Sequence, residues 1–342
     1  MHKPESITTG AQDIELSVVV PIYNEERFIE KCVTSLMHQD YPINRVEIML
    51  VDGRSTDSTP RILRELEERY PETVRVFDNP GRIQSCAMNI GMRNARGKYL
   101  MRIDAHAEYP DKYFKVCTTL LEEKGADNVG CSWITSSRTD SGRLIAKMLS
   151  TSFAVGGSKF RTNAPSGFVD TVPFGTFRTD FLKEMGGFDE RLARSEDNEL
   201  NYRIRKNGGK VYLTNEICTT YYCRETISSL ARMAFDNGKW NVIAAYLCPG
   251  SMSIKYFVPL AFAVSLVLLP LLSLIDTRVL FLLGGELALY LFLAARSCRT
   301  QTQEALDIAQ MVWLYPLFHV SYGIGSLAGI ASLFTKDFKE NR

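Results

Sequence analysis

A carboxylate and an imidazole stand two residues apart in this sequence, shortly after an apolar run. The run is Tyr99-Leu100-Met101, and the two groups are Asp104 and His106. Aspartate oxygen and neutral imidazole nitrogen both bind divalent first-row metal ions. A metal ion held by both side chains can in turn hold a diphosphate. The spacing therefore predicts a metal site for a phosphorylated ligand; the alternative is that His106 is a packed or capping histidine.

Polar residues follow three other apolar runs in the same way. They are Asn24 and Glu25 after the first run, Asp52, Ser55 and Asp57 after the second, and Asn79 and Arg82 after the third. Each loop alone is explained by the preference of Asn, Asp, Gly and Ser for turns. Turns do not require a Glu, an Arg and a His at one edge, however. The four loops together therefore indicate a ligand site.

The segments around these loops alternate between strand and helix patterns. Continuous apolar runs predict strands over residues 16–22, 46–51, 74–77 and 99–103. Apolar positions at helical spacing predict helices over residues 26–38, 60–70 and 82–95. This order predicts an α/β fold with a mainly parallel sheet and helices on both faces. Ligands of such sheets bind beyond the carboxyl ends of the strands, where the four loops would meet.

An acidic pair further along the chain is a candidate for proton transfer. Glu196 and Asp197 follow Ser195 and precede a helix-like run over residues 198–206. A carboxylate beside an acceptor hydroxyl can act as a general base. Two acidic residues in a first helical turn are also typical of capping, because their charge favours the helix dipole. Both interpretations stay open from the sequence.

In their order along the chain, these motifs resemble those of family 2 glycosyltransferases, which have the GT-A fold. The similar segments are Pro21 to Glu25, Val51 to Thr59, Asn79 to Ile83, Asn89 to Gly91, Ala95 to Tyr99, Asp104 to His106, Pro173 to Gly175, Gly186 to Glu190 and Glu196 to Leu200. Within the family, the chain is similar to the membrane-attached subgroup that includes succinoglycan-synthesis glucosyltransferases.

The resemblance implies a donor site for a UDP-sugar. The uridine pocket would be lined by Pro21, Tyr23, Glu25 and Asp52, and Arg82 would lie against the nucleotide. Asp104 and His106 would hold Mg²⁺ or Mn²⁺ on the diphosphate. The family more often has a second Asp in place of His106, and the imidazole favours Mn²⁺.

The resemblance also implies a role for the acidic pair. Asp197, with Glu196 beside it, would take the proton of the acceptor hydroxyl. No further Asp or Glu is evidently placed to form a glycosyl-enzyme intermediate, so inversion at the anomeric carbon is expected. Processive relatives carry Gln-x-x-Arg-Trp where this chain has Asp236-Asn237-Gly238-Lys239-Trp240. Because the Gln and the Arg are absent, we expect one sugar to be added per acceptor.

Hydropathy separates a polar part from an apolar C-terminal part. Residues 1–13 are polar, contain no apolar signal core and are expected to form a flexible N-terminus. The catalytic domain is expected over residues 14–225. Residues 226–250 carry apolar and polar positions at helical spacing, which predicts an amphipathic helix on the membrane surface. An ordinary connecting helix is the alternative.

A transmembrane region is predicted over residues 255–335. Runs without Asp, Glu, Lys or Arg cover residues 256–275 and 311–334, and both are long enough to span a membrane. A shorter run over residues 279–295 contains Glu286. We expect three spans, with two as the alternative, in which the shorter run lies partly in the interface.

Two further features bear on the membrane region. Two spans would place the last basic residues on the side of the catalytic domain, as the positive-inside tendency prefers; these are Lys336, Lys339 and Arg342. Gly325 and Gly329 form a G-x-x-x-G step, which is typical of close helix packing but is also common in membrane helices.

Composition excludes other classes of protein. The chain has 40 Lys and Arg residues against 39 Asp and Glu residues and contains no long basic block, so no nucleic-acid partner is expected. None of the eight cysteines forms a C-x-x-C pair. Free buried thiols in a reducing compartment are therefore expected, rather than a disulfide framework or a zinc site.

Three functions are consistent with the sequence. The first is transfer from a UDP-sugar to a polyprenyl-diphosphate-linked saccharide at the plasma membrane, with the catalytic domain in the cytoplasm. The second is synthesis of a polyprenyl-monophosphate sugar, whose phosphate would need basic residues near the membrane, such as Arg203, Arg205, Lys206 and Arg224. The third is an inactive membrane scaffold of a glycan-assembly complex. The presence of Asp104, His106 and Asp197 together argues against the third.

Overall fold

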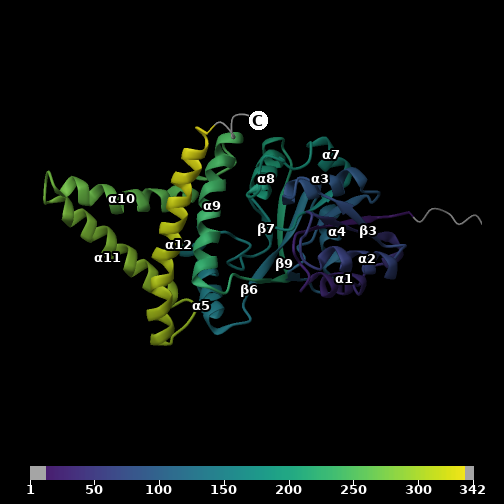
Figure 1. Cartoon of the computed structure of the whole chain (residues 1–342), viewed down its shortest axis with the longest axis horizontal. Helices are drawn as coiled ribbons and strands as arrows, with labels where there is room; N and C mark the ends of the chain where they lie inside the picture. Colours follow the sequence, from purple (N-terminus) through teal and green to yellow (C-terminus); the bar gives the residue numbers. More distant parts are fainter. Residues whose placement is uncertain (1–12, 336–342) are drawn as a thin grey trace, which may run out of the picture.

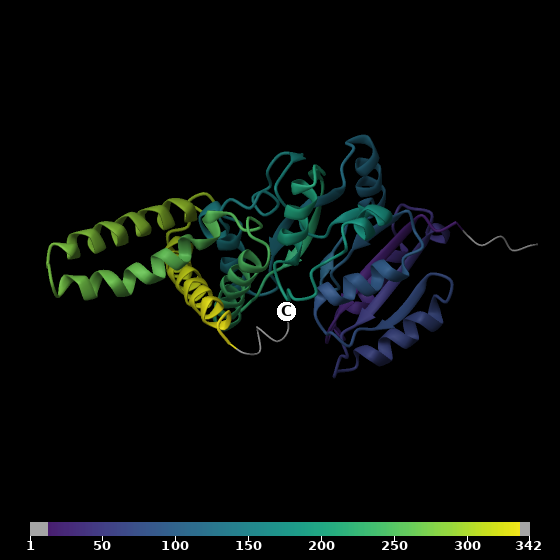
Figure 2. The same ribbon diagram turned by 90° about the horizontal axis from the view of Figure 1, so that it is seen from above.

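The computed structural model describes residues 13–335. Residues 1–12 of the expected flexible N-terminus, and the basic residues Lys336, Lys339 and Arg342, therefore lie outside the described residues. An α/β body contains the sheet, and long helices from the second half of the chain stand beside it (Figure 1). Two of these helices extend away from the body as a hairpin (Figures 1 and 2).

Within residues 13–335, nine strands form one mainly parallel sheet. The strands are β1 (Leu16–Ile22), β2 (Val46–Asp52), β3 (Val74–Asp78), β4 (Tyr99–Arg102), β5 (Ala107–Glu108), β6 (Asn128–Ser136), β7 (Gly167–Phe168), β8 (Thr176–Arg178) and β9 (Val211–Tyr222). Their order is β3-β2-β1-β4-β8-β6-β9-β5, with β7 paired to β9. Strands β1 to β4 are parallel, and β8 runs antiparallel between β4 and β6. The four predicted strands correspond to β1 to β4, which confirms the α/β sheet.

Helices cover both faces of this sheet. They are α1 (Ile29–Met37), α2 (Thr59–Arg69), α3 (Gln84–Asn94), α4 (Tyr113–Glu123), α7 (Thr179–Glu184) and α8 (Glu196–Lys206). Successive residues of a strand point to opposite faces. Val18 and Val20 of β1 therefore pack in a core with α1, α2 and α4, whereas Val19 packs in a second core with α3, α7 and α8. The predicted helices correspond to α1, α2 and α3.

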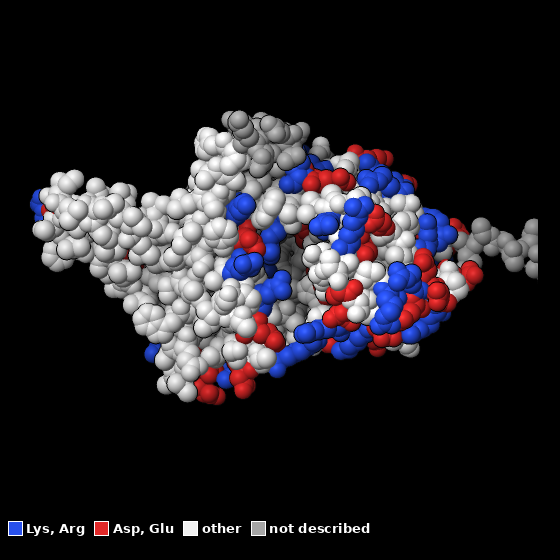
Figure 3. Space-filling view, in the orientation of Figure 1, with Lys and Arg blue, Asp and Glu red and all other residues white. Residues whose placement is uncertain are grey.

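The other helices lie mainly beside the body. They are η1 (Ile43–Arg45), α5 (Asp140–Leu149), α6 (Ser152–Val155), α9 (Ile227–Leu247), η2 (Ile254–Phe257), α10 (Val258–Ser273), α11 (Val279–Cys298) and α12 (Ala305–Ser332). Two stretches of the described chain are long and apolar enough to cross a membrane, Ile254–Ser273 and Val279–Cys298. They form the hairpin, whose surface is almost free of charge (Figure 3).

The membrane prediction needs one correction. The run over residues 279–295, expected to be the weakest, forms a full-length apolar helix in α11. The run over residues 311–334, expected to be a full span, is not one of the two candidates; it lies in α12, which packs along α9. A Cβ atom on Gly325 would lie 2.0 Å from the carbonyl oxygen of Phe235, and one on Gly329 would lie 2.6 Å from that of Lys239. The G-x-x-x-G step is therefore a close helix-packing site.

A third core joins the body to these long helices. Its buried side chains come from α5, α6, α9, α11 and α12, and include Ile145, Met148, Leu149, Leu230, Met233, Ala294, Met311 and Tyr315. At its edge, Asp307 of α12 pairs with Arg143 (3.1 Å) and Lys147 (2.7 Å) of α5. The segment expected to be the catalytic domain and the C-terminal helices therefore share buried surface.

Candidate active site

The loops after β1, β2 and β3 meet at one edge of the sheet, and each contains a residue in the left-handed region. The φ angles are 56° for Asn24, 62° for Arg54 and 61° for Arg82. Residues other than glycine rarely adopt such angles, and those that do concentrate at binding and catalytic sites. The backbone at this edge is therefore held in a specific shape.

Hydrogen bonds join the first two of these loops. Asp52 Oδ1 accepts from the Ser55 hydroxyl (2.6 Å) and amide (3.1 Å), and Ser55 Oγ accepts from the Asn24 amide (2.8 Å). The Glu25 amide donates to Thr59 Oγ1 (2.9 Å). Asp52 therefore organises the edge. The ring of Tyr23 is 49% exposed beside it, so it is accessible to a planar ligand.

Arg102, at the end of β4, connects the two candidate catalytic segments. It is 5% exposed and bonds three carboxylates: Nε lies 3.2 Å from Asp104 Oδ1, and Nη1 lies 3.1 Å from Glu196 Oε1 and 2.7 Å from Asp197 Oδ1. The side chains of Glu196 and Asp197 therefore both bond Arg102. The residue before them, Ser195, is the N-cap of α8 with φ 65° and makes no side-chain cap. These contacts favour a site role over capping.

Charge is not balanced around this guanidinium. Burial and the nearby charge of Asp197 raise the pKa of Glu196 to about 7. Burial also raises the pKa of Asp197, and the Arg102 charge opposes that shift only in part. Arg102 supplies one positive charge against three carboxylates. The remaining negative charge favours protonation, so a carboxyl of this group holds its proton to a higher pH than it would in water. The site therefore contains a carboxyl that can exchange a proton near neutral pH.

Asp104 and His106 are the candidate ligands for a divalent ion. His106 Nδ1 lies 3.1 Å from Glu25 Oε1, an arrangement that commonly orients a metal-binding imidazole. Asp104 Oδ1 accepts from Arg102 and from Gln84 Nε2 (3.1 Å), while Oδ2 accepts no hydrogen bond from residues 13–335. One oxygen and the second ring nitrogen therefore remain for an ion.

Protein ligands alone do not complete such a site. Within the described part of the chain, no group of three or more His, Cys, Asp and Glu side chains is arranged to hold a metal. The residues therefore fit an ion that takes its other ligands from a bound diphosphate and from water.

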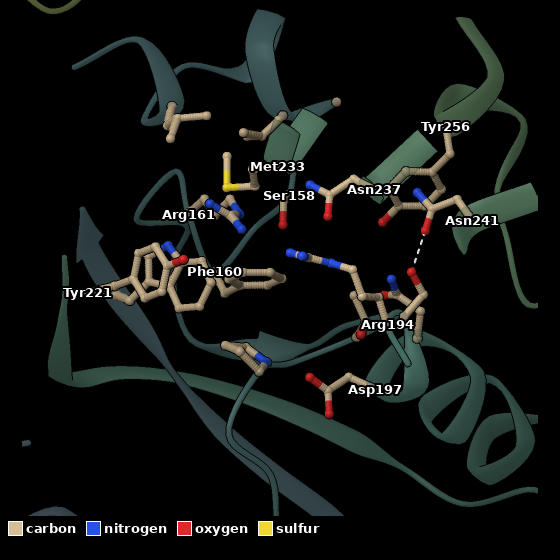
Figure 4. A pocket seen from close by; sticks show the side chains of 18 of the residues that line it. Ser158, Phe160, Arg161, Arg194, Asp197, Tyr221, Met233, Asn237, Asn241 and Tyr256 are labelled. Atoms are coloured by element: carbon tan, nitrogen blue, oxygen red, sulfur yellow. Dashed lines mark hydrogen bonds between the residues drawn. The ribbon is translucent and has the colours of Figure 1, made fainter. Parts of the chain in front are cut away.

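A cavity of about 420 Å³ opens beside these residues. Arg102, Asp104, His106, Glu196 and Asp197 line one side of it. Residues of the C-terminal helices line another part, and these are Met233, Asn237, Asn241, Lys255, Tyr256, Pro259, Phe318 and Tyr322. Figure 4 shows Asp197 facing Met233 and Asn237 across the cavity.

The structure separates the predicted site residues into two groups. Asp104, His106, Glu196 and Asp197 line the cavity. The residues expected to contact the nucleotide do not line it, and lie on β1, at the end of β2 or in the loops after β1 and β3: Pro21, Tyr23, Glu25, Asp52 and Arg82. Glu25 joins the groups through its bond to His106. Asp104 and His106 therefore lie between a nucleotide edge and the cavity.

One of the four basic residues considered for a phosphate acceptor lines the cavity, and it is Arg224. The prediction is wrong for the other three. Arg203 forms an ion pair within α8, and Arg205 and Lys206 lie beside the ring of Tyr202. Their position on α8 directs them away from the cavity.

Among the polar residues that line the cavity, sequence reasoning gave no role to Arg102, Arg161, Arg194 and Asn241. The sequence did contain a signal for Arg102, because it is a charged residue at the end of an apolar strand and close to Asp104. Asn241 of α9 accepts from the Ser195 hydroxyl (2.5 Å, the dashed line in Figure 4) and donates to the Tyr322 hydroxyl. No motif marks this link, because it joins residues that are distant in sequence.

Known proteins of similar sequence act on glycans. The chain is 30% identical over 323 residues to the dolichyl N-acetyl-alpha-D-glucosaminyl phosphate 3-beta-D-2,3-diacetamido-2,3-dideoxy-beta-D-glucuronosyltransferase of Methanococcus voltae, covering 90% of this chain and 95% of the relative. It is 34% identical over 254 residues to the succinoglycan biosynthesis protein ExoA of Rhizobium meliloti, covering 72% and 74%.

The fold and a family model agree with these relatives. The structure is similar to the mannosyltransferase PcManGT from Pyrobaculum calidifontis in complex with GDP-Man and Mn²⁺, with a TM-score of 0.65, 18% identity, and coverage of 93% of this chain and 87% of the other. The model of Glycosyl transferase family 2 matches residues 17–186, from β1 to the end of α7. The chain therefore belongs to glycosyltransferase family 2 and has the GT-A fold.

Proposed function

We propose that this enzyme is an inverting glycosyltransferase that moves a sugar from a UDP-sugar to a lipid-linked saccharide in polysaccharide or glycolipid synthesis. One observation carries the proposal. The carboxylates around Arg102 and the first residues of the apolar hairpin, Lys255 and Tyr256, line the same cavity. An acceptor anchored in a membrane by a polyprenyl chain can therefore reach the carboxylates without leaving the membrane surface.

The donor would lie across the edge formed by the loops after β1, β2 and β3. Tyr23 and Asp52 would contact the uridine, and Arg82 the nucleotide. Asp104 and His106 would hold Mn²⁺ or Mg²⁺ against the diphosphate. A bound ion of this kind supplies Lewis-acid stabilisation of the leaving diphosphate. The positions of Asp104 and His106, between this edge and the cavity, support that assignment.

Asp197 would take the proton of the attacking hydroxyl. The acceptor oxygen forms a bond to the anomeric carbon while the bond from that carbon to the diphosphate breaks, and the configuration inverts. The raised pKa of Asp197, caused first by burial, suits a base that works near neutral pH. Arg102 bonds Asp104 and Asp197 at once, so it would hold the base at a fixed position relative to the leaving group.

The relatives support a lipid-linked acceptor. The Methanococcus voltae enzyme, by its name, acts on a dolichyl N-acetylglucosaminyl phosphate, a sugar joined to a polyprenol through phosphate. The Rhizobium meliloti protein takes part in the synthesis of succinoglycan, a polysaccharide. Both matches extend past the family domain, which ends at residue 186, into the part of the chain that lines the membrane side of the cavity.

We also propose two membrane spans, with the body on the cytoplasmic side of the plasma membrane. The hairpin leaves the body at η2 and returns to it at the start of α12, so both of its ends lie on the side of the body (Figures 1 and 2). This arrangement agrees with the positive-inside tendency of the C-terminal Lys and Arg residues.

A second candidate function is synthesis of a polyprenyl-monophosphate sugar. The observation that favours it is the group of basic residues at the cavity, Arg161, Arg194, Arg224 and Lys255. In this reaction a phosphate oxygen attacks the anomeric carbon, and no general base is needed because the nucleophile is already ionised. An inactive scaffold is the least supported function, because Arg102 holds Asp104, Glu196 and Asp197 together in an open cavity.

The test is a transfer assay with the full-length protein in membranes. UDP-, GDP- and dTDP-sugars are each offered with polyprenyl phosphate, polyprenyl diphosphate or a membrane lipid extract, and lipid-linked product is measured with and without Mn²⁺ or Mg²⁺. We expect a metal-dependent product of inverted configuration from a UDP-sugar and a lipid that already carries a saccharide. Transfer to polyprenyl monophosphate alone would select the second candidate function. A product of retained configuration would contradict the proposed displacement.

A further inference from the structure

We propose that Arg161, Arg194 and Lys255 form a binding site for the phosphate that joins the acceptor saccharide to its lipid. The inference rests on the proposed function and adds the part of the acceptor that the enzyme recognises. All three residues line the cavity that contains Asp197. They come from separate segments: the loop after α6, the loop before α8, and η2 at the start of the apolar hairpin.

Arg161 is a cation without a counter-ion. Its guanidinium lies 4.3 Å from the ring centroid of Trp133 and 6.0 Å from that of Tyr221, but its side chain makes no ion pair or hydrogen bond with any residue of 13–335. Burial lowers its pKa, and the charge of Arg194 adds to that effect. Arg161 is half-buried, and a cation partly removed from water is unfavourable unless a negative group pairs with it. Aromatic rings hold this guanidinium in place for an anion that a ligand can supply.

The other two cations keep donors for an anion. Arg194 forms an ion pair with Asp236, but its Nη1 lies 3.8 Å from Asp236 Oδ2, too far for a hydrogen bond. Lys255 is exposed and lies 5.5 Å from the ring of Tyr256, with no carboxylate partner in the described chain. The guanidinium groups of Arg161 and Arg194 point into the cavity from different sides (Figure 4). Two planar guanidinium groups and an ammonium suit the several oxygens of a phosphate.

The position of the three cations favours the acceptor over the donor. Lys255 is the second residue of the 20-residue stretch Ile254–Ser273, the first of the two candidate spans. Apolar side chains of the neighbouring helices, Pro259 and Phe318, line the cavity next to it. A lipid chain can therefore leave the cavity where the hairpin enters the membrane. Tyr23, Asp52 and Arg82, expected to contact the nucleotide, do not line this cavity.

Arg224 is a fourth cation at the cavity, but it is exposed and acts electrostatically on His106, so it belongs to the donor side. On the surface, Lys and Arg side chains gather around the hollow between the body and the long helices (Figure 3). A phosphate bound by Arg161 and Arg194 leaves room for the sugar next to it to approach Asp197. The three cations would then select saccharides that carry a lipid phosphate.

The experiment measures binding to the full-length protein purified in neutral detergent. Three probes are used: farnesyl phosphate, farnesol as its uncharged counterpart, and UDP with Mn²⁺ for the donor side. The variants are Arg161→Gln, Arg194→Gln and Lys255→Gln. The matched control is Arg232→Gln, which removes the same charge from an exposed position of α9 outside this cavity.

We expect the wild-type protein to bind farnesyl phosphate at least about ten-fold more tightly than farnesol. Arg161→Gln and Arg194→Gln should each weaken farnesyl phosphate binding by about ten-fold or more, and Lys255→Gln by about three-fold, since its charge is exposed. Affinity for farnesol and for UDP with Mn²⁺ should stay within about two-fold of wild type in all of them. The control should match wild type with every probe.

Two results would overturn the inference. The first is equal binding of farnesyl phosphate and farnesol by the wild-type protein. The second is loss of UDP affinity with farnesyl phosphate affinity retained, which would assign the cations to the donor diphosphate. If Arg161→Gln lowers the melting temperature too far for measurement, the more exposed Arg194 and Lys255 variants decide. Phosphate binding that behaves as expected, without transfer from any donor, would leave this site standing and reject the proposed function.

Discussion

The proposed donor side and the proposed acceptor side of this enzyme are built in different ways. The donor edge consists of loops that directly follow β1, β2, β3 and β4, which are neighbouring parallel strands. The proposed acceptor cavity takes its walls from segments far apart in the chain: residues at and after the end of β4, and residues of β6, α6, α8, α9, η2 and α12. Neighbouring strands place their loops together through local connections, whereas the cavity depends on packing between distant segments.

This difference has a practical consequence for substitutions. A change on the donor side should remove one chemical group and leave the surrounding structure intact. A change on the acceptor side should act partly through the helices that hold the cavity open. Measuring donor affinity, transfer rate and melting temperature on each variant separates the two kinds of effect.

The largest effect is expected at Asp104. If Asp104 holds the metal ion on the diphosphate, Asp104→Ala should lower the transfer rate by about 10⁴-fold, since Lewis-acid stabilisation is worth several kcal/mol. Excess chelator should inactivate the wild-type enzyme to a similar degree. Asp111→Ala, at an exposed position outside the cavity, is the control. Full activity in chelator would remove Asp104 and His106 from a metal-binding role.

The next largest effect is expected at Asp197. Asp197→Asn should lower transfer to a sugar hydroxyl by about 10²- to 10⁴-fold, the usual contribution of a positioned base. UDP affinity should stay near wild type, because Asp197 lies in the cavity and not at the donor edge. If the residue only caps α8, asparagine would preserve both fold and rate. A rate within a few-fold of wild type would exclude Asp197 as the base.

A smaller effect is expected at Asn241, which has no contact with the donor edge. Asn241→Ala removes the bond that holds Ser195, the residue before the acidic pair. We expect the transfer rate to fall by about ten-fold with unchanged UDP affinity, because the carboxylates lose part of their fixed position. Ser195→Ala should have a similar effect. The double variant should be no worse than either single one, since all three lack the same bond. Additive losses would show that the two residues act separately.

The last prediction concerns the pH dependence of stability and not the transfer rate. Burial raises the pKa of Glu196 from 4.5 to about 7, so the folded protein should keep this proton to a higher pH than the unfolded chain. Stability should therefore fall as the pH rises between these values, by at most about 1.4 kcal/mol per pH unit. Glu196→Gln should flatten this part of the curve, and Glu72→Gln, at an exposed position, should not. Thermal unfolding from pH 4.5 to 8 measures the difference, and identical curves for Glu196→Gln and wild type would contradict the assignment.

The donor side could be predicted from sequence because its signals are local. Strands buried on both faces appear as unbroken apolar runs, and the polar residues that follow them belong to one edge by the geometry of parallel sheets. Asp104 and His106 were identified in this way, and Glu196 and Asp197 were identified as an acidic pair before a helix-like run; the structure brings all four to one cavity. Whether they bind metal and move protons stays a prediction until the variants are measured.

The acceptor side could not be predicted to the same extent. Arg161 and Arg194 stand in loops without a motif, and only tertiary packing brings them to the cavity. The ranking of the apolar runs failed for a different reason. It counted charged residues, and the run over residues 311–334 has no Asp, Glu, Lys or Arg, but its Trp, Tyr, His, Pro, Ser and Gly residues lower its mean hydropathy. The helix that contains this run packs along α9.

The contacts of α12 bear on when the enzyme becomes active during its synthesis. The Tyr315 hydroxyl lies 3.0 Å from Thr151 Oγ1, and Tyr322 contacts Asn241, which holds the residue before the acidic pair. Chains emerge from the ribosome N-terminus first. The sheet and its donor edge can therefore form early, whereas the acceptor cavity stays incomplete until α12 follows the apolar hairpin. A nascent chain would reach its membrane before it could transfer a sugar.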